Sequence, residues 1–217
     1  KQSCDVFFYE ISKKLGIDKI AEVAKDFGLG QSYDISLPNQ KTGIVPNKKW
    51  KKEKMGESWY AGETLISAIG QGFVLTNPFQ LAVMTSIIAS NGKMIEPTII
   101  KGNRVSFKTN EKYSKEIKII KKAMFKVVNE NKGTAFKSRL QDIKFAGKTG
   151  TSQVRRISLS ERESDDFREK EQEWKNRDHA LFVGYMPYDD PKYSISVIIE
   201  HGGSGASTAA PIAKQIF

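Results

Sequence analysis

The stretch ALFVGYM (residues 180–186), the turn YDDP (188–191) and the stretch YSISVIIE (193–200) decide the fold. Both longer stretches are rich in β-branched and aromatic residues, which favour strands. The turn contains aspartates, whose side chains bond nearby backbone groups, and a proline, which fixes φ. These residues predict two antiparallel strands, and a further strand is predicted before them over residues 145–154 (FAGKTGTSQV).

Most of the remaining chain has helical hydrophobic spacing. Helices are predicted over residues 3–14, 20–27, 78–90, 113–131 and 208–217, with Asp18 as the N-cap of the second. A short strand is predicted over 96–100, and a long surface excursion over 31–62. Helices, then consecutive strands, then a last helix predict an α+β fold, with an antiparallel sheet flanked by helices.

The composition is that of an ordinary globular domain. Of 217 residues, 39% are hydrophobic and 28% are charged, which suffices for one domain with a sizeable core. No apolar run is long enough to span a membrane. The chain starts at Lys1, without a methionine, and enters a helical pattern at once, so we expect a domain truncated at its N-terminal side.

The formal net charge of +10 would suit a nucleic-acid partner, because basic surfaces attract phosphates. The lysines are dispersed, however, and no RRM, KH, zinc-finger or helix-turn-helix signature accompanies them. We therefore expect a solvated basic surface and no nucleic-acid partner.

The single cysteine, Cys4, excludes an internal disulfide. The two histidines, His179 and His201, lie far apart in the sequence and give no metal-ligand spacing. Cys4 is expected to be a small buried thiol, with the alternative that it ligates a metal together with residues upstream of Lys1. No metal and no cofactor are predicted, and His201 is expected at the surface or in a turn.

Lys148-Thr149-Gly150-Thr151 (KTGT), inside the strand predicted over 145–154, is the most informative motif. Since side chains alternate along a strand, Lys148 points to one face and Thr149 and Thr151 to the other. One face can send an ammonium group toward a nucleophile, and the other offers two hydroxyls to a substrate carboxylate. Gly150 lets an extended peptide lie close to the strand, and the amide N–H of Thr151 suits an oxyanion. A plain edge strand is the competing interpretation.

A second motif, Ser3-Cys4-Asp5, stands about 145 residues before Lys148. Taken alone, Ser3 fits a helix N-cap better than a catalyst. Its order relative to KTGT and the residues between the two motifs favour a functional interpretation.

These motifs resemble the transpeptidase domain of class B penicillin-binding proteins, whose signature set is S-x-x-K, S-D-N and K-T-G. Ser3-Cys4-Asp5 is similar to the second signature in the variant form S-x-D. The resemblance also rests on the blocks WYAGET (59–64), IGQG (69–72), TNPFQLA (76–82), GTA (133–135) and RDHALFVGYMP (177–187). His179 in the last block, together with Asp5, is similar to the penicillin-binding protein 2 branch, with the septal penicillin-binding protein 3 branch as the alternative.

The resemblance covers nearly the whole chain and implies a penicillin-binding/serine β-lactamase-like fold. Residues 1–217 would form one partial transpeptidase domain, with a charged insertion at about 155–177 that is exposed rather than functional.

The resemblance implies a peptidoglycan D,D-transpeptidase of side-wall synthesis that is a target of β-lactams. In that family the serine of S-x-x-K attacks the penultimate D-alanine carbonyl of a stem peptide, and a neighbouring stem takes up the acyl group. Carried onto this chain, Ser3 relays protons near the leaving group, Asp5 bonds the acyl chain, and Lys148 supports Ser3 and the nucleophile. Thr149 and Thr151 bind the terminal carboxylate.

The chain departs from the family at its first motif. The only S-x-x-K pattern, Ser90-Asn91-Gly92-Lys93, lies after S-x-D, and Asn-Gly favours a turn rather than a helix that could place Lys93 beneath Ser90. We therefore interpret it as coincidence and expect the nucleophile upstream and the chain itself inactive. Asp5 stands where asparagine is commoner. Its carboxyl group can donate a hydrogen bond only if it is protonated; as a carboxylate it would instead accept one from a substrate amide.

The resemblance also implies partners and a location. The partners are peptidoglycan stem peptides, β-lactams and a membrane glycosyltransferase, and the catalytic domain lies in the bacterial periplasm with an inner-membrane anchor outside this chain. Two alternatives stay open: a serine β-lactamase, which needs a deacylating base, and a β-lactam sensor or inert scaffold domain. His179 begins a strand beside the site and faces either the substrate or the core.

Overall fold

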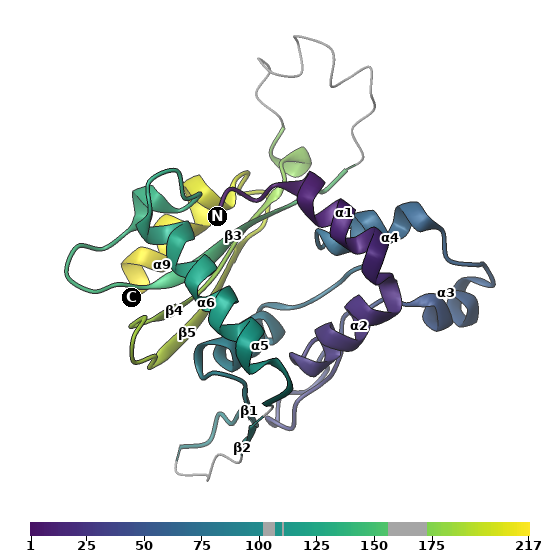
Figure 1. Ribbon diagram of the computed structural model, residues 1–217, viewed down its shortest axis with the longest axis horizontal. Coiled ribbons are helices and arrows are strands. Elements are labelled where there is room, and N and C mark those ends of the chain that lie inside the picture. Colours follow the sequence, from purple (N-terminus) through teal and green to yellow (C-terminus); the bar gives the residue numbers. More distant parts are fainter. Residues whose placement is uncertain (102–106, 110, 156–172) are drawn as a thin grey trace.

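Three antiparallel strands form the central sheet of the part of the chain that the structure describes (Figure 1). The computed structural model describes residues 1–101, 107–109, 111–155 and 173–217. The strands β3 (Ala146–Ser152), β4 (His179–Met186) and β5 (Tyr193–Ile199) lie in the order β3-β4-β5. They confirm the three predicted strands and the α+β class. Within the described residues β3 is an edge strand, so one side of its backbone has no neighbouring strand.

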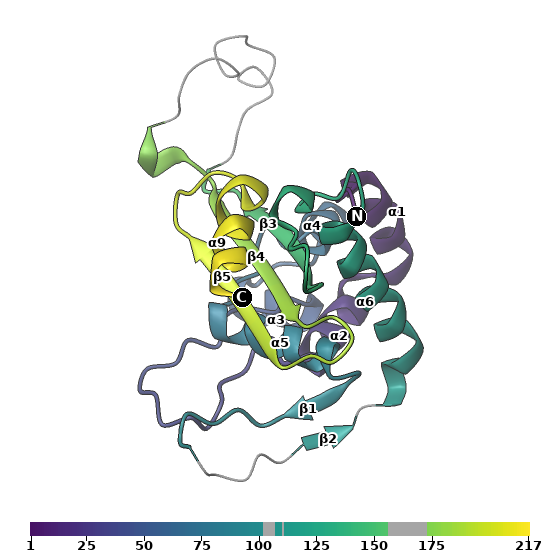
Figure 2. The ribbon, with the colours of Figure 1, turned by 90° about the vertical axis from the view of Figure 1, so that its left-hand side faces the viewer.

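Helices cover both faces of this sheet, as Figure 2 shows for α6 and α9. On one face α5 (Pro78–Ala89) and α6 (Ser114–Asn129) pack around Tyr185. On the other, the π-helix η4 (Gly205–Ala209) and α9 (Ala210–Ile216) pack around Phe182. Since side chains alternate along β4, Tyr185 and Phe182 point to opposite faces of the sheet and pack in different hydrophobic clusters. These helices confirm those predicted over 78–90, 113–131 and 208–217.

Phe182 packs across two glycines that face each other in the strand register. Gly147 lies opposite Gly184, and Phe182 is 0% exposed. A Cβ atom at Gly147 would lie 2.1 Å from Phe182 Cζ, and one at Gly184 would lie 2.7 Å from Phe182 Cε1. Both glycines are therefore required by the packing of the ring, which fixes β3 against β4.

Four helices lie beside the sheet, in the purple and blue part of Figure 1. They are α1 (Asp5–Leu15), α2 (Ile17–Asp26), α3 (Lys48–Met55) and α4 (Ala61–Ala68). The Lys112 ammonium joins α2 to the start of α6 by pairing with Glu22 at 2.8 Å and Asp26 at 3.0 Å. Of these helices, α1 and α4 contribute side chains to the cavity beside the free edge of β3.

The start of α2 differs from the prediction. Gly16 occupies the N-cap position, and Asp18 lies in the first turn, where it accepts from the backbone N–H of Lys48 at 3.1 Å. The prediction of Asp18 as N-cap was wrong because Gly16, with φ of 75°, ends α1 and lets α2 begin at once.

The region 31–62 is not the irregular excursion that was predicted, because it contains α3 and the start of α4. The sequence of α3, KKWKKEKM, has few apolar residues and gives no clear periodicity. Lys51 is nevertheless 1% exposed, pairs with Glu63 at 2.5 Å and lies over the Tyr60 ring. A buried ion pair holds this helix where an apolar stripe would normally do so.

Two other predicted regions need correction or lie outside the described residues. The strand predicted over 96–100 was wrong: β1 (Lys93–Ile95) ends before it and pairs with β2 (Phe107–Thr109). Most of the charged insertion predicted at 155–177 lies outside the described residues. Its last part contains the short 3-10 helix Trp174–Asn176.

The apolar residues of α1 are exposed, although their helical spacing predicted the helix itself. Val6 is 66% exposed, Phe7 58% and Leu15 52%, and Ser12 is the buried residue of this helix. Among the described residues no helix combines the length and apolar character that crossing a membrane requires.

We expect Phe182→Ala to lower the free energy of unfolding by about 3–5 kcal/mol, because it empties a buried site beside two glycines that cannot fill it. Urea denaturation of wild type and variant measures the difference. Ile119→Ala on α6, where the side chain is 69% exposed, is the control and should change stability by about 0.5 kcal/mol or less. Equal small losses in both variants would contradict the role given to Phe182.

Candidate active site

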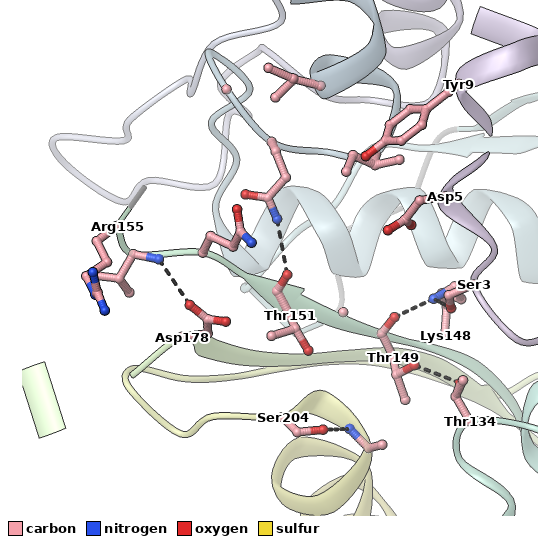
Figure 3. Close-up of a pocket in the computed structure, with 18 residues that line it drawn as sticks. Ser3, Asp5, Tyr9, Thr134, Lys148, Thr149, Thr151, Arg155, Asp178 and Ser204 are labelled. Atoms are coloured by element: carbon pink, nitrogen blue, oxygen red, sulfur yellow. Dashed lines mark hydrogen bonds between the residues drawn. The ribbon is translucent and has the colours of Figure 1, made fainter. Parts of the chain in front are cut away.

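A cavity of about 1250 Å³ opens between the free edge of β3, the start of α1 and the loop that follows α4 (Figure 3). Its lining includes all six residues predicted as catalytic or substrate-binding: Ser3, Asp5, Lys148, Thr149, Gly150 and Thr151. The fold thus brings together two motifs that are 145 residues apart in the sequence.

The side chain of Lys148 joins the two motifs. Its Nζ donates to Ser3 Oγ at 2.7 Å and to the carbonyl oxygen of Thr149 at 2.5 Å. Ser3 has φ of 52°, in the left-handed region that residues other than glycine rarely adopt. It is not the N-cap of α1, because Cys4 holds that position. The unusual backbone of Ser3 instead turns its hydroxyl toward the lysine, as strained residues at functional sites often do.

Burial lowers the pKa of the Lys148 amine below its ordinary value, and the nearby carboxylate of Asp5 opposes the shift. A lowered pKa makes the neutral amine more accessible near neutral pH. Lys148 can therefore accept a proton as well as donate hydrogen bonds, and Ser3 is within reach to pass that proton on.

Thr149 and Thr151 point to the opposite face of β3 from the lysine, as their alternation predicted. Thr149 Oγ1 lies 2.8 Å from Thr134 Oγ1, and Thr151 Oγ1 accepts from the backbone N–H of Gly205 at 3.4 Å. A Cβ atom at Gly205 would lie 2.2 Å from the carbonyl oxygen of Gly150, so the start of η4 packs directly on the strand. Two hydroxyls beside the N-terminal end of a helical segment favour an anionic group such as a carboxylate.

The family of the chain follows from comparison with known proteins. The model of the penicillin binding protein transpeptidase domain matches residues 1–217. The chain belongs to this transpeptidase domain family. The penicillin-binding fold expected from the sequence is therefore shown.

The transpeptidase domain has relatives of known name and structure. It is 33% identical over 230 residues to the peptidoglycan D,D-transpeptidase MrdA of Haemophilus influenzae. The matched region covers 100% of this chain and 34% of the relative. The structure of a complex between penicillin-binding protein 2 and MreC from Helicobacter pylori matches with a TM-score of 0.84 at 33% identity, covering 99% of this chain and 38% of that one. A third match is a peptidoglycan synthase complex, described by its structural coordination of polymerization and crosslinking. It has a TM-score of 0.80 at 29% identity, and the match covers 99% of this chain and 35% of that one. The chain spans about a third of the length of the curated relatives it matches.

Asp5 and Tyr9 line the cavity of the transpeptidase domain from consecutive turns of α1 (Figure 3). Asp5 lies in the first turn, where the helix dipole favours a carboxylate. Tyr9 was not predicted as a site residue. Its i, i+4 spacing from Asp5 is the signal that could have found it, because residues four apart share a helix face.

Gln71 is a second cavity residue that was not predicted as a site residue. Its Nε2 donates to the carbonyl oxygen of Thr151 at 3.1 Å. Gln71 stands between Gly70, with φ of 77°, and Gly72, with φ of 69°. Two glycines around one residue indicate a tight turn, but the spacing in the sequence does not show what that turn faces.

The histidines lie at one end of the sheet. His179 begins β4 as predicted, but it is not among the residues that line the cavity. Its Nδ1 accepts from the backbone N–H of His201 at 2.9 Å, so the side chain faces this neighbouring turn. His201 lies in the turn after β5, in agreement with its prediction.

Neither Cys4 nor residues 90–93 line the cavity. Cys4 is exposed, so the prediction of a buried thiol was wrong; it stands at the N-cap of α1, outside the helix packing. Among the described residues no group of three or more His, Cys, Asp or Glu could hold a metal ion. Ser90 is the C-cap of α5 and Asn91 has φ of 59°, so the helix does not continue to Lys93, and the turn predicted at Asn91-Gly92 is confirmed.

The pH dependence of stability should reveal the lowered pKa of Lys148. Between that lowered pKa and the ordinary value of 10.5, the unfolded chain binds more protons than the native domain, so the contribution of Lys148 to the free energy of unfolding rises with pH. Lys148→Met should remove this rise, which denaturation between about pH 7 and 10 would measure. Lys192→Met, at a side chain that is 60% exposed, is the control. Parallel curves for wild type and Lys148→Met would contradict the assignment.

Proposed function

We propose that the protein is a peptidoglycan D,D-transpeptidase that works through an acyl-serine intermediate. The observation that carries the proposal is the bond of Lys148 Nζ to Ser3 Oγ at 2.7 Å, on the wall of a large cavity beside the hydroxyls of Thr149 and Thr151. A proton relay, an anion site and a strand edge open to a peptide are the parts that acyl transfer from a peptide carboxyl end requires. The names of the relatives support the same activity.

In the first step, a serine oxygen attacks the carbonyl of the penultimate D-alanine. Its proton passes to the neutral amine of Lys148. The C–N bond breaks as Ser3 delivers its hydroxyl proton to the departing amine of the terminal D-alanine, and Lys148 returns a proton to Ser3. In the second step, the amine of a neighbouring stem attacks the ester, gives up a proton to the same relay and releases the serine. β-Lactams would stop at the first step, because the opened ring remains attached to the acyl group.

The remaining site residues would bind the substrate. Thr149 and Thr151 would hold the terminal carboxylate, and the backbone N–H of Thr151 would stabilise the oxyanion. Gly150 would leave room for the peptide along β3. Asp5, which carries a negative charge when ionised, would accept from a substrate amide rather than donate to it.

We further propose that the nucleophilic serine belongs to a part of the protein outside residues 1–217. Ser90, the serine of the S-x-x-K pattern in this chain, ends a helix outside the cavity lining. Residues 1–217 would then supply the second and third motifs of a partial domain and would be inactive alone.

The relatives also support a cellular setting. One is a complex with MreC, and another is a peptidoglycan synthase complex that couples polymerization and crosslinking. For this protein we propose a membrane glycosyltransferase partner, side-wall synthesis as its role, and a catalytic domain in the periplasm anchored to the inner membrane.

The full-length protein from the native gene should gain the mass of one penicillin molecule when it is incubated with benzylpenicillin. Intact mass and peptide mapping should place a lasting adduct on one serine outside residues 1–217. Rapid loss of the adduct would indicate a β-lactamase. No adduct on a folded protein would indicate an inert scaffold and overturn the proposed activity.

Lys148→Ala in the full-length protein should lower the rate constant of acylation by about 10²–10⁴-fold, because general acid–base catalysis contributes factors of this size. Its thermal unfolding should change little. Lys192→Ala, at an exposed lysine in the turn before β5, serves as the matched control. A wild-type acylation rate in Lys148→Ala would remove this lysine from the mechanism.

A further inference from the structure

The free edge of β3 makes a side-chain contact that the proposed mechanism does not use. Alternate residues of a strand turn their backbone groups to the same edge, so the carbonyls of Thr149 and Thr151 both point away from β4. The Thr149 carbonyl accepts from Lys148 Nζ at 2.5 Å, and the Thr151 carbonyl accepts from Gln71 Nε2 at 3.1 Å. Both outward carbonyls along this part of the cavity are therefore hydrogen-bonded to side chains.

The loop that presents Gln71 is anchored from behind. The backbone N–H of Gln71 donates to the carbonyl oxygen of Ile66 at 3.1 Å. Two residues later, the ring of Phe73 packs 5.4 Å from the ring of Trp50 and 6.3 Å from that of Trp59, measured between centroids. The contact with Thr151 thus comes from a fixed backbone position, and only the side chain of Gln71 has to move for the contact to break.

We propose that Gln71 is a specificity-determining residue that competes with the backbone amide of a ligand for the Thr151 carbonyl. A carboxamide has the same hydrogen-bonding groups as a peptide unit, so Gln71 holds the place of one at the strand edge. An extended peptide that pairs with β3 donates an N–H to the Thr151 carbonyl and displaces Nε2 of Gln71. A ligand without this N–H leaves the hydrogen bond between Gln71 and the Thr151 carbonyl intact. The inference rests on the proposed function, because the displacing ligand is the acyl donor.

The competition between Gln71 and a ligand sets the size of the effect. The net contribution of one hydrogen bond corresponds to a factor of about 2 to 10 in an equilibrium constant. Removing the donor of Gln71 frees the carbonyl and should favour an amide-bearing ligand by about this factor. A ligand without the amide gains nothing from the freed carbonyl.

The test uses the full-length protein and two penams that share one ring system. Benzylpenicillin carries an acylamino side chain, and the second probe carries hydrogen in its place. Gln71→Met keeps the length of the side chain and loses the donor. It should raise the acylation rate constant for benzylpenicillin about 2- to 10-fold relative to the second probe. Gln71→Asn, which is too short to reach Thr151 from the same backbone, should give the same change.

Gln153→Met is the matched control, because Gln153 is another glutamine of the cavity lining. This variant should leave the ratio of the two rate constants unchanged. Equal changes for both probes in Gln71→Met, or a selective loss for benzylpenicillin, would overturn the proposal and reduce Gln71 to a residue that holds the loop. If wild type is acylated by neither probe, the proposed function fails, and this inference fails with it.

Discussion

The packing of Phe182 across Gly147 and Gly184 is the constraint on which the rest of the structure depends. The two glycines are paired in the register of β3 and β4, and neither position has room for a Cβ atom. A slip of one residue would set a side chain against the ring and turn every residue of β3 to the opposite face. Lys148 directly follows Gly147, so the ring that locks this register also determines that the lysine faces Ser3 while the threonines face η4.

That arrangement places opposing electrostatic effects on one amine. Burial of Lys148 favours its neutral form, and the carboxylate of Asp5 favours its charged form. The balance suits a group that must both take and return a proton within one catalytic cycle. The hydroxyl of Ser3 comes from the segment before α1, and the carboxylate of Asp5 comes from the first turn of α1. The properties of the lysine therefore depend on contact between distant segments. The left-handed backbone of Ser3 is the local strain that this contact sustains.

The sequence predicts the elements whose signal is local and leaves out those that depend on tertiary contact. The three strands of the sheet follow from their β-branched residues, and α5 follows from Asn77 and Pro78, which cap and start it. In contrast, α3 was missed because the ion pair of Lys51 replaces an apolar stripe. For the site, the ordered motifs identified the residues that meet in the cavity. Gln71 was missed because its partner lies 80 residues away, and His179 could not be oriented because its partner is a backbone N–H in another turn.

An exposed strand edge is normally a hazard, since its unpaired backbone groups can bind the edge of another chain. The edge of β3 contains glycines and has the outward carbonyls of Thr149 and Thr151 bonded to side chains. Side-chain donors protect these carbonyls without closing the edge permanently, because a lysine and a glutamine can turn away while a neighbouring strand cannot. A partner must then bring enough additional contacts to replace them. A peptide whose carboxylate reaches the two threonine hydroxyls has such contacts, and a chance strand from another protein lacks them, so the protection of the edge and the recognition of substrate follow from the same bonds.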